Sequence, residues 1–286
     1  MGLPCGTYNV NYAKEMAIIR TGMQWGLASA GIVFLCCFPL FISEAWLNVL
    51  NIICITMIAV FGLSILTGYT GQINIGQSAF MGVGAYTSAV LATNFGLPFW
   101  VALPCAGIMA GLVGLVFGAP ALKVKGLYLA LATLAAQFIL HWVFMHWGYL
   151  GGHAGTAAPY PSIAGMSLKT TGSYFYLLLG LTLLMGIFAK NIVRTSLGRA
   201  FIAIRDNDKA AEGMGINVYN YKLLAFFIGC FYAGVAGSLL AHYSGFANYD
   251  FYTLEDSIWM LGMLVVGGMG GIMGAAFGTL FIKLIE

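Results

Sequence analysis

Small and amide side chains within one apolar stretch are the first residues that could act on a solute. The segment GYTGQINIGQSAFMGVGAY, residues 68–86, interleaves five glycines with amide and hydroxyl groups. An amide without a hydrogen-bond partner in hydrocarbon costs several kcal/mol, so such a group must face protein or a water-lined cavity. The available chemistry is therefore hydrogen bonding to a polar solute. The candidate pathway residues are Gly71, Gln72, Asn74, Gln77 and Ser78.

Two structures would account for this segment. In the first, an interrupted helix borders a translocation path, and its amides and loosened backbone face the solute. In the second, the glycines let helices approach closely and the amides tie neighbouring helices together. The stretch 68–93 could also span a membrane or re-enter it. The sequence leaves these alternatives open.

The second candidate site is the charged segment 190–222. It holds nine of the 21 charged residues in the chain, six of them Lys or Arg. Because it lies between long apolar stretches, it must be in water, and its excess of positive charge predicts the cytoplasmic side. We interpret it as a docking surface for a soluble partner, with a solvated loop as the alternative. The residues assigned to this surface are Arg199, Arg205, Asp206, Asp208, Glu212 and Gly213.

Local patterns predict two short helices within this segment. Thr195 or Ser196 can cap the first, whose apolar positions share one face: Leu197, Phe201 and Ile204. One of residues 206–208 can cap the second, 209–214, and Gly215 can end it. Helices this short cannot span a membrane. We predict that the two helices, with this apolar stripe, form a knob that enters a groove on a partner.

Composition determines which elements position these residues. The chain is 60% hydrophobic and 7% charged, whereas soluble domains are about a quarter charged, so a water-soluble fold is excluded. A helix needs about 20 apolar residues to cross a bilayer. We predict an all-α, polytopic transmembrane bundle of about eight helices, interrupted near 68–86. The predicted spans are 24–42, 46–67, a third ending near 93, 99–122, 126–147, 174–189, 223–243 and 257–282.

Charge distribution predicts the orientation of these spans. With eight spans and a cytoplasmic N-terminus, 11 of the 12 Lys and Arg lie on cytoplasmic segments, and only Lys169 lies outside. The acidic residues Glu44, Asp250, Glu255 and Asp256 then lie outside. We predict a cytoplasmic lead at 1–20, which is no cleavable signal, and a single transmembrane domain at 21–286. The whole chain is expected in the bacterial inner membrane, in contact with lipid.

Missing motifs exclude several function classes. The chain has no Gly-Lys pair, and therefore no phosphate-binding loop of the G-x-x-x-x-G-K-[ST] type. It also has no H-E-x-x-H or G-x-S-x-G motif. We therefore expect no enzymatic activity, no catalytic or metal-binding residues and no cofactor. Basic residues beside predicted membrane ends give no reason to expect nucleic acid. Few charged residues lie within the spans, which argues against an ion-coupled carrier.

Several blocks of sequence resemble the LivM-type membrane permeases of ATP-binding-cassette importers for branched-chain amino acids. The blocks are LTGYTGQINIGQSAFMGVGAY (66–86), KGLYLALATLAAQF (125–138), GRAFIAIRDNDKAAEGMGINVYNYKLLAF (198–226), GSLLAHY (237–243) and VVGGMGGIMGAAFG (265–278). The resemblance covers about residues 10–282. It implies that 198–215 couples the chain to an ATPase, since AAEGMG is similar to the family's coupling loop. Members of this family usually continue with another helical region after a stretch like GTLFIKLIE, and the sequence leaves open whether the chain is complete at Glu286.

The resemblance implies a set of partners and a class of solute. The partners are a second related permease subunit, two cytoplasmic ATP-binding subunits and a periplasmic substrate-binding protein. The solute would be a branched-chain amino acid, or a related small polar solute such as urea or an amide, because GGHAGT at 151–156 departs from the family pattern. The residues alone leave two other functions open. These are a stand-alone channel or secondary transporter, and a scaffold subunit without a path.

Overall fold

The computed structural model describes residues 43–121, 127–163, 166–167 and 170–285. Apart from Ser43, these residues belong to one compact unit, Glu44–Glu286. The predicted cytoplasmic lead, residues 1–20, and the predicted span 24–42 lie outside the described residues.

The predicted all-α fold is confirmed. In chain order the helices are α3 Glu44–Leu63, the π-helical η2 Ser64–Tyr69, α4 Gln77–Asn94, α5 Phe99–Ala121, α6 Leu127–His146, α7 Thr171–Arg194, α8 Ser196–Asp206, α9 Asp208–Gly213, α10 Val218–Ser244, α11 Leu254–Gly267 and α12 Ile272–Ile285. Among the described residues, three single 3-10 turns lie in the connections: η3 Gly148–Leu150, η4 Gly152–Ala154 and η5 Tyr249–Phe251.

Strands among the described residues are two residues long. β1 Thr156–Ala157 pairs antiparallel with β4 Phe246–Ala247, and β2 Ser162–Ile163 pairs antiparallel with β3 Met166–Ser167. The first pair joins the α6–α7 connection to the segment after α10. These ladders fasten loops together and form no layer of the fold.

Five described helical stretches are long and apolar enough to cross a membrane. They are Glu44–Tyr69, Phe99–Ala121, Tyr128–His146, Thr171–Arg194 and Val218–Ser244. A sixth crossing results if the bent pair Tyr249–Gly267 and Ile272–Ile285 forms one span. The five agree with the spans predicted from 46–67, 99–122, 126–147, 174–189 and 223–243. The polytopic helical fold is thus confirmed, while the number of crossings is approximate.

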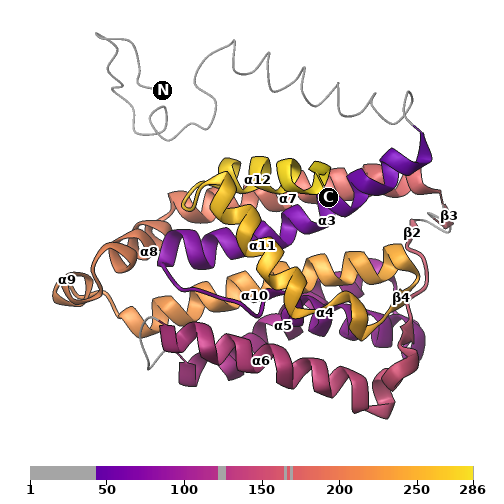
Figure 1. Ribbon diagram of the computed structural model, residues 1–286, viewed down its shortest axis with the longest axis horizontal. Coiled ribbons are helices and arrows are strands. Elements are labelled where there is room, and N and C mark those ends of the chain that lie inside the picture. The colour runs from indigo at the N-terminus through magenta and orange to yellow at the C-terminus, as the bar shows by residue number, and fades with distance from the viewer. Residues whose placement is uncertain (1–42, 122–126, 164–165, 168–169, 286) are drawn as a thin grey trace, which may run out of the picture. The chain divides into compact units, whose positions relative to one another are not determined.

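The prediction of one continuous helix at 257–282 is wrong. The helix breaks between α11 and α12, which are bent by 119° with respect to each other, as Figure 1 shows in yellow. The cause is local: Gly268 and Gly270 have φ angles of 100° and 98°, in the region that favours glycine. An uncharged stretch is not interrupted by glycines, so the sequence pattern does not show this break. The backbone can nevertheless leave the helix at glycines 267, 268, 270 and 271.

The core is centred on α10, which packs against α3, α4 and α5. Close approach between α4 and α10 depends on glycine, since a Cβ added at Gly84 would overlap the backbone of Gly234. Phe226 and Leu239 of α10 are buried in this core, and Phe226 lies against Gly114 and Gly118 of α5. Figure 1 shows α8 and α9 at one end of this bundle.

Candidate functional site

The interruption predicted near 68–86 lies between η2 and α4. η2 is a widened π turn, a feature found frequently at functional sites. The backbone is non-helical over 71–76, and Gly71 has a φ angle of 69°. α4 then begins at Gln77. The interruption is confirmed. Of the candidate pathway residues, Gly71 is exposed and the other four are buried: Gln72, Asn74, Gln77 and Ser78.

Buried amides hold this break in place. Asn74 Oδ1 accepts a hydrogen bond from the Gly76 N–H at 2.9 Å, and Asn74 Nδ2 donates to Gln77 Oε1 at 2.8 Å. Gln77 Nε2 donates to the carbonyl of Ala59 in α3 at 3.1 Å and to that of Gly229 in α10 at 3.2 Å. One side chain therefore ties α3, α4 and α10 together, and all three helices are coupled to the break.

The first turn of α4 is held by two side chains that the sequence analysis did not single out. The Ser78 N–H donates to Ser257 Oγ at 2.9 Å, and the Ala79 N–H donates to Gln137 Oε1 at 2.9 Å. Ser257 Oγ also donates to Gln137 Oε1 at 3.2 Å. These bonds satisfy N–H groups that a helix start leaves without an intrahelical partner. The available signal was a lone amide, Gln137, within an apolar span.

Gln72 connects the break to the N-terminal part of α10. Its Nε2 donates to Thr70 Oγ1 at 3.0 Å and to the carbonyl of Lys222 at 3.1 Å. The Lys222 ammonium in turn pairs with the carboxylate of Asp208, at the start of α9, at 2.7 Å. The candidate pathway and the candidate docking segment, more than a hundred residues apart in sequence, therefore meet at Lys222.

Arg205 makes a second contact between the two candidate segments. Its Nη1 donates to the carbonyl oxygen of Gly68, in η2, at 3.1 Å. Its Nε and Nη2 both donate to Asp206 Oδ1 at 3.2 Å, which orients the guanidinium. A Cβ added at Gly71 or at Gly270 would lie 3.1 or 3.2 Å from the Arg205 side chain. Arg205 thus lies where η2, the break and the α11–α12 bend come together.

The remaining docking candidates lie on the outer side of α8 and α9. Arg199, Asp206, Glu212 and Gly213 are exposed, whereas Asp208 is half-buried in its pair with Lys222. Among the described residues, no group of three or more His, Cys, Asp and Glu side chains is placed to hold a metal ion. The site therefore consists of a hydrogen-bonded break, two polar links and an exposed charged surface.

Comparison with known proteins identifies the family of this chain. A family model described as the branched-chain amino acid transport system / permease component matches residues 45–286. The chain belongs to this family. It is a multi-pass membrane protein by its apolar helices and by its family.

Individual relatives agree with the family match. The high-affinity branched-chain amino acid transport system permease protein LivM of Escherichia coli K12 is 30% identical over 84% of this chain and 62% of its own length. A probable LivM of Methanocaldococcus jannaschii is 26% identical over 65% of this chain and 54% of its own length. The autoinducer 2 import system permease protein LsrC of Klebsiella pneumoniae is 34% identical over 32% of this chain and 28% of its own length. The chain thus spans less than two thirds of the length of these LivM relatives. No solved structure gives a significant match.

The capping prediction for this permease-family segment is correct for α9 and wrong for α8. Asn207 Oδ1 accepts hydrogen bonds from the N–H groups of Lys209 and Ala210 at 3.0 and 3.2 Å. Thr195 precedes α8, but its hydroxyl donates back to the Ile192 carbonyl of α7 at 2.7 Å and caps nothing. The reason is that α7 runs almost directly into α8, so the last carbonyls of α7 are within reach of that hydroxyl.

The apolar stripe of α8 packs mainly within this chain, and docking of the two short helices on a partner stays a prediction. Phe201 and Ile204 are buried within this chain, and the Phe201 ring lies edge-on to Tyr221 of α10 at 6.4 Å between centroids. The stripe therefore attaches α8 to the permease fold itself. The apolar group that does reach the surface here is Met214, just after α9, with 81% of its area exposed. The sequence patterns of this segment did not predict this exposed residue.

Proposed function

We propose that this chain is the membrane-spanning permease subunit of an ATP-binding-cassette importer in the bacterial inner membrane. The solute is a branched-chain amino acid or a related small polar molecule, and separate ATPase subunits supply the energy. The chain itself does no covalent chemistry. Its partners are a second related permease subunit, two cytoplasmic ATP-binding subunits and a periplasmic substrate-binding protein. The N-terminus is cytoplasmic in this proposal.

The observation that carries the proposal is the contact between Arg205 and Gly68. The ATPase subunits of such an importer lie outside the membrane. The surface that contacts them must therefore be connected mechanically to the helices that border the path. In this proposal the exposed surface of α8 and α9 contacts the ATPase through Arg199, Glu212, Gly213 and Met214. Arg205 and the Asp208–Lys222 pair supply the connection to η2 and α10.

Movement of α8 would act on the break first, because 71–76 is the non-helical part of this region. α4 could then shift relative to α3 and α10, which share the Gln77 hydrogen bonds. In the conformation described here, Gln72, Asn74, Gln77 and Ser78 are buried, and the side-chain amides of the first three donate hydrogen bonds to protein groups. We infer that they border the path only when this packing changes, which makes the break a closed gate.

Reconstitution tests this function directly. The chain would be incorporated into liposomes with the second permease, the ATPase subunits and the binding protein, and uptake of labelled leucine would be followed with and without ATP. We expect uptake that requires ATP and every partner. Uptake by this chain alone, without ATPase subunits, would instead identify a channel or secondary transporter. Assembly with the partners but no uptake under any condition would indicate a scaffold subunit.

A further inference from the structure

Polar side chains gather where α4 meets α6 and the segment that leads into α11. We call this contact the polar seam and define it by four buried residues: Ser78, Gln137, Tyr252 and Ser257. A hydroxyl or amide group buried between membrane helices is unfavourable unless it is hydrogen-bonded. How these groups are used therefore indicates whether the seam serves helix packing alone.

Gln137 uses both ends of its side-chain amide to hold the polar seam closed. Its Oε1 accepts a hydrogen bond from the Ala79 N–H at 2.9 Å, and its Nε2 donates to the carbonyl oxygen of Tyr252 at 2.9 Å. One turn earlier on α6, Thr133 Oγ1 accepts from the Ile75 N–H, in the break, at 3.1 Å. α6 thus holds the break, the start of α4 and the segment before α11 together.

Two hydroxyl groups of the polar seam are unused in this arrangement. Ser78 Oγ and Tyr252 OH have no hydrogen-bond partner among the described residues, although both side chains are fully buried. Other buried tyrosines do find partners: Tyr174 OH donates to the carbonyl of Leu239 at 2.9 Å. A buried polar group without a partner is unfavourable and needs a reason beyond packing. A partner that arrives in another conformation is such a reason.

The two sides of α4 differ in what an opening would require. Toward α10 the contact is between backbones, since a Cβ added at Gly237 would overlap the carbonyl oxygen of Met81. Toward the polar seam, a Cβ added at Gly82 would instead meet the rings of Phe144 and Tyr252. Rings can change rotamer, whereas helix backbones can only move as a whole. An opening on the seam side therefore needs ring rotation and the release of Gln137.

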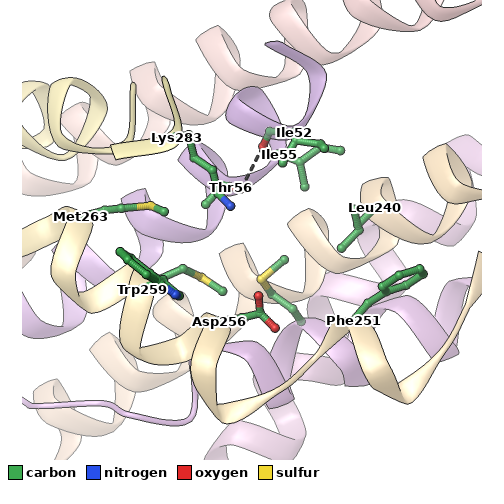
Figure 2. A pocket seen from close by; sticks show the side chains of 11 residues that line it. Ile52, Ile55, Thr56, Leu240, Phe251, Asp256, Trp259, Met263 and Lys283 are labelled. Carbon is green, nitrogen blue, oxygen red and sulfur yellow. Dashed lines mark hydrogen bonds between the residues drawn. The ribbon is translucent and has the colours of Figure 1, made fainter. Parts of the chain in front are cut away.

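The polar seam offers hydrogen bonds without charge. Asp256 precedes Ser257 in the chain, but it lines a pocket with Thr56 of α3 and Leu240 of α10, as Figure 2 shows. The seam residues themselves carry hydroxyl and amide groups. Because a solute that is moved through the membrane must also leave each site, weak contacts of this kind suit a passage.

We propose that the polar seam forms one wall of the solute path. Ser78 and Tyr252 hydrogen-bond the solute, and Gln137 is a positioning residue that keeps the wall closed. When the coupling segment displaces the break, α4 withdraws from α6 and α11, and the two unused hydroxyls face the path. The inference rests on the proposed function. It adds the side of α4 that opens and two residues of the path, Gln137 and Tyr252.

Tyr252→Phe and Ser78→Ala test this inference because each removes only an unused hydroxyl. No hydrogen bond within the described part of the chain is lost, so the melting temperature of the purified chain should stay the same or rise. Uptake of labelled leucine by the reconstituted importer should nevertheless fall about two- to tenfold, the effect of one lost hydrogen bond. Association with the ATPase subunits should be unchanged.

The matched controls remove buried hydroxyls that are bonded within the chain. Tyr232 OH donates to the carbonyl of Met185 at 3.0 Å, and Ser88 Oγ, on another face of α4, donates to that of Ala85 at 3.1 Å. Tyr232→Phe should lower the melting temperature by about 2–4 °C and leave uptake per folded importer unchanged. Ser88→Ala should also leave uptake unchanged. The two kinds of variant thus have opposite effects on stability and uptake.

Thiol labelling tests the opening itself. Ser78→Cys would be placed in a chain whose six native cysteines are replaced and treated with a water-soluble maleimide. We expect labelling only during ATP-driven turnover, with Ser88→Cys protected throughout. Gln137→Met, which removes the hydrogen bonds at similar side-chain length, should allow labelling of Ser78→Cys without ATP. Equal labelling of Ser88→Cys would indicate local unfolding and would overturn the role of Gln137.

The inference is overturned if Tyr252→Phe and Ser78→Ala both keep wild-type uptake, or if Ser78→Cys stays protected during turnover. The proposed function would stand in either case, because uptake by the wild-type assembly would still require ATP and the partner subunits. Absence of ATP-dependent uptake by the wild-type assembly would overturn the proposed function and this inference together.

Discussion

Arg205 donates a hydrogen bond to the carbonyl oxygen of Gly68 at 3.1 Å, across 137 residues of sequence. Gly68 lies in the π turn, where the regular helical bonding pattern is widened. A carbonyl in such a turn is available to a donor from outside the helix. The guanidinium takes this role while Asp206 holds its other edge. A residue of the short helix α8 thus fixes the end of a helix predicted to border the path.

This contact predicts that Arg205→Gln uncouples ATP hydrolysis from transport. We expect uptake per ATP hydrolysed to fall about tenfold, since a hydrogen bond to a charged group contributes about 1.5–3 kcal/mol. Arg205→Lys should recover only part of it, because an ammonium lacks the planar fork. Co-purification of the ATPase subunits should stay unchanged. The measurements are uptake and phosphate release by the reconstituted importer.

Arg199→Gln provides the contrasting variant for Arg205. Arg199 is exposed on the same helix and is assigned to the docking surface. We expect this substitution to weaken association with the ATPase subunits while the assembled fraction keeps its ratio of uptake to hydrolysis. If Arg205→Gln lowered association and left that ratio unchanged, Arg205 would be a docking residue and its internal contact would have no role in coupling.

Much of the fold can be predicted from the sequence because hydropathy and the length of the apolar stretches indicate the membrane-spanning helices. The five long apolar stretches, the break near 71–76 and the cap at Asn207 all depend on residues close to one another in the chain. The sequence also predicts that amide side chains within the apolar spans are hydrogen-bonded, because a buried amide needs a partner at any position. Gln77 was predicted as a site residue for this reason, although the sequence does not specify which carbonyls its amide contacts.

The features that were missed depend on contacts between distant segments. The orientation of the Arg205 side chain is set by a backbone carbonyl in another helix. Because every residue has a backbone carbonyl, the sequence does not show which one accepts this hydrogen bond. The apolar stripe of α8 meets Tyr221 instead of a partner, and periodicity cannot distinguish these two surroundings. The bend at 268–271 depends on glycine conformation, which hydropathy does not detect.

Met214 is predicted to be an anchor of the ATPase interface. Its side chain is almost fully exposed at the outer end of α9, beside Glu212 and Gly213. A flexible thioether suits a pocket on a partner, and one anchor can contribute a large part of an interface's energy. Met214→Ser should reduce co-purification of the ATPase subunits about tenfold and leave the melting temperature of the chain unchanged.

The matched control for Met214 is Met269→Ser, since Met269 is also exposed, in the loop between α11 and α12. It should leave ATPase association at the wild-type level. Equal losses from both substitutions would mean that exposed methionines affect the sample in a general way, through lipid or detergent contact. In that case Met214 would have no specific place in the interface.

The close approach of α4 and α10 predicts that Gly→Ala substitutions at two helical glycines have very different effects on stability. A Cβ added at Gly84 meets the backbone of Gly234, which cannot move without separating the helices. Gly84→Ala should therefore destabilise the chain by about 1–3 kcal/mol. Gly180 of α7 has open space where its Cβ would lie, so Gly180→Ala should be neutral or stabilising by about 0.5–1 kcal/mol. Thermal unfolding in detergent measures both changes, and similar values would show that α4 and α10 are not in close contact.

Gln77 provides the sharpest test of whether the buried amides act as a gate or only as packing. Its Nε2 serves the carbonyls of Ala59 and Gly229, so Gln77→Ala leaves two buried acceptors without this donor and should cost about 1–3 kcal/mol of stability. Asn94→Ala, at the exposed end of the same helix, should cost little. If Gln77 belongs to a gate, a destabilised closed state should also raise ATP hydrolysis in the absence of solute. Lower stability with unchanged basal hydrolysis would assign Gln77 to helix packing alone. A rise in basal hydrolysis that Asn94→Ala does not share would mean that the break between η2 and α4 moves with the ATPase cycle.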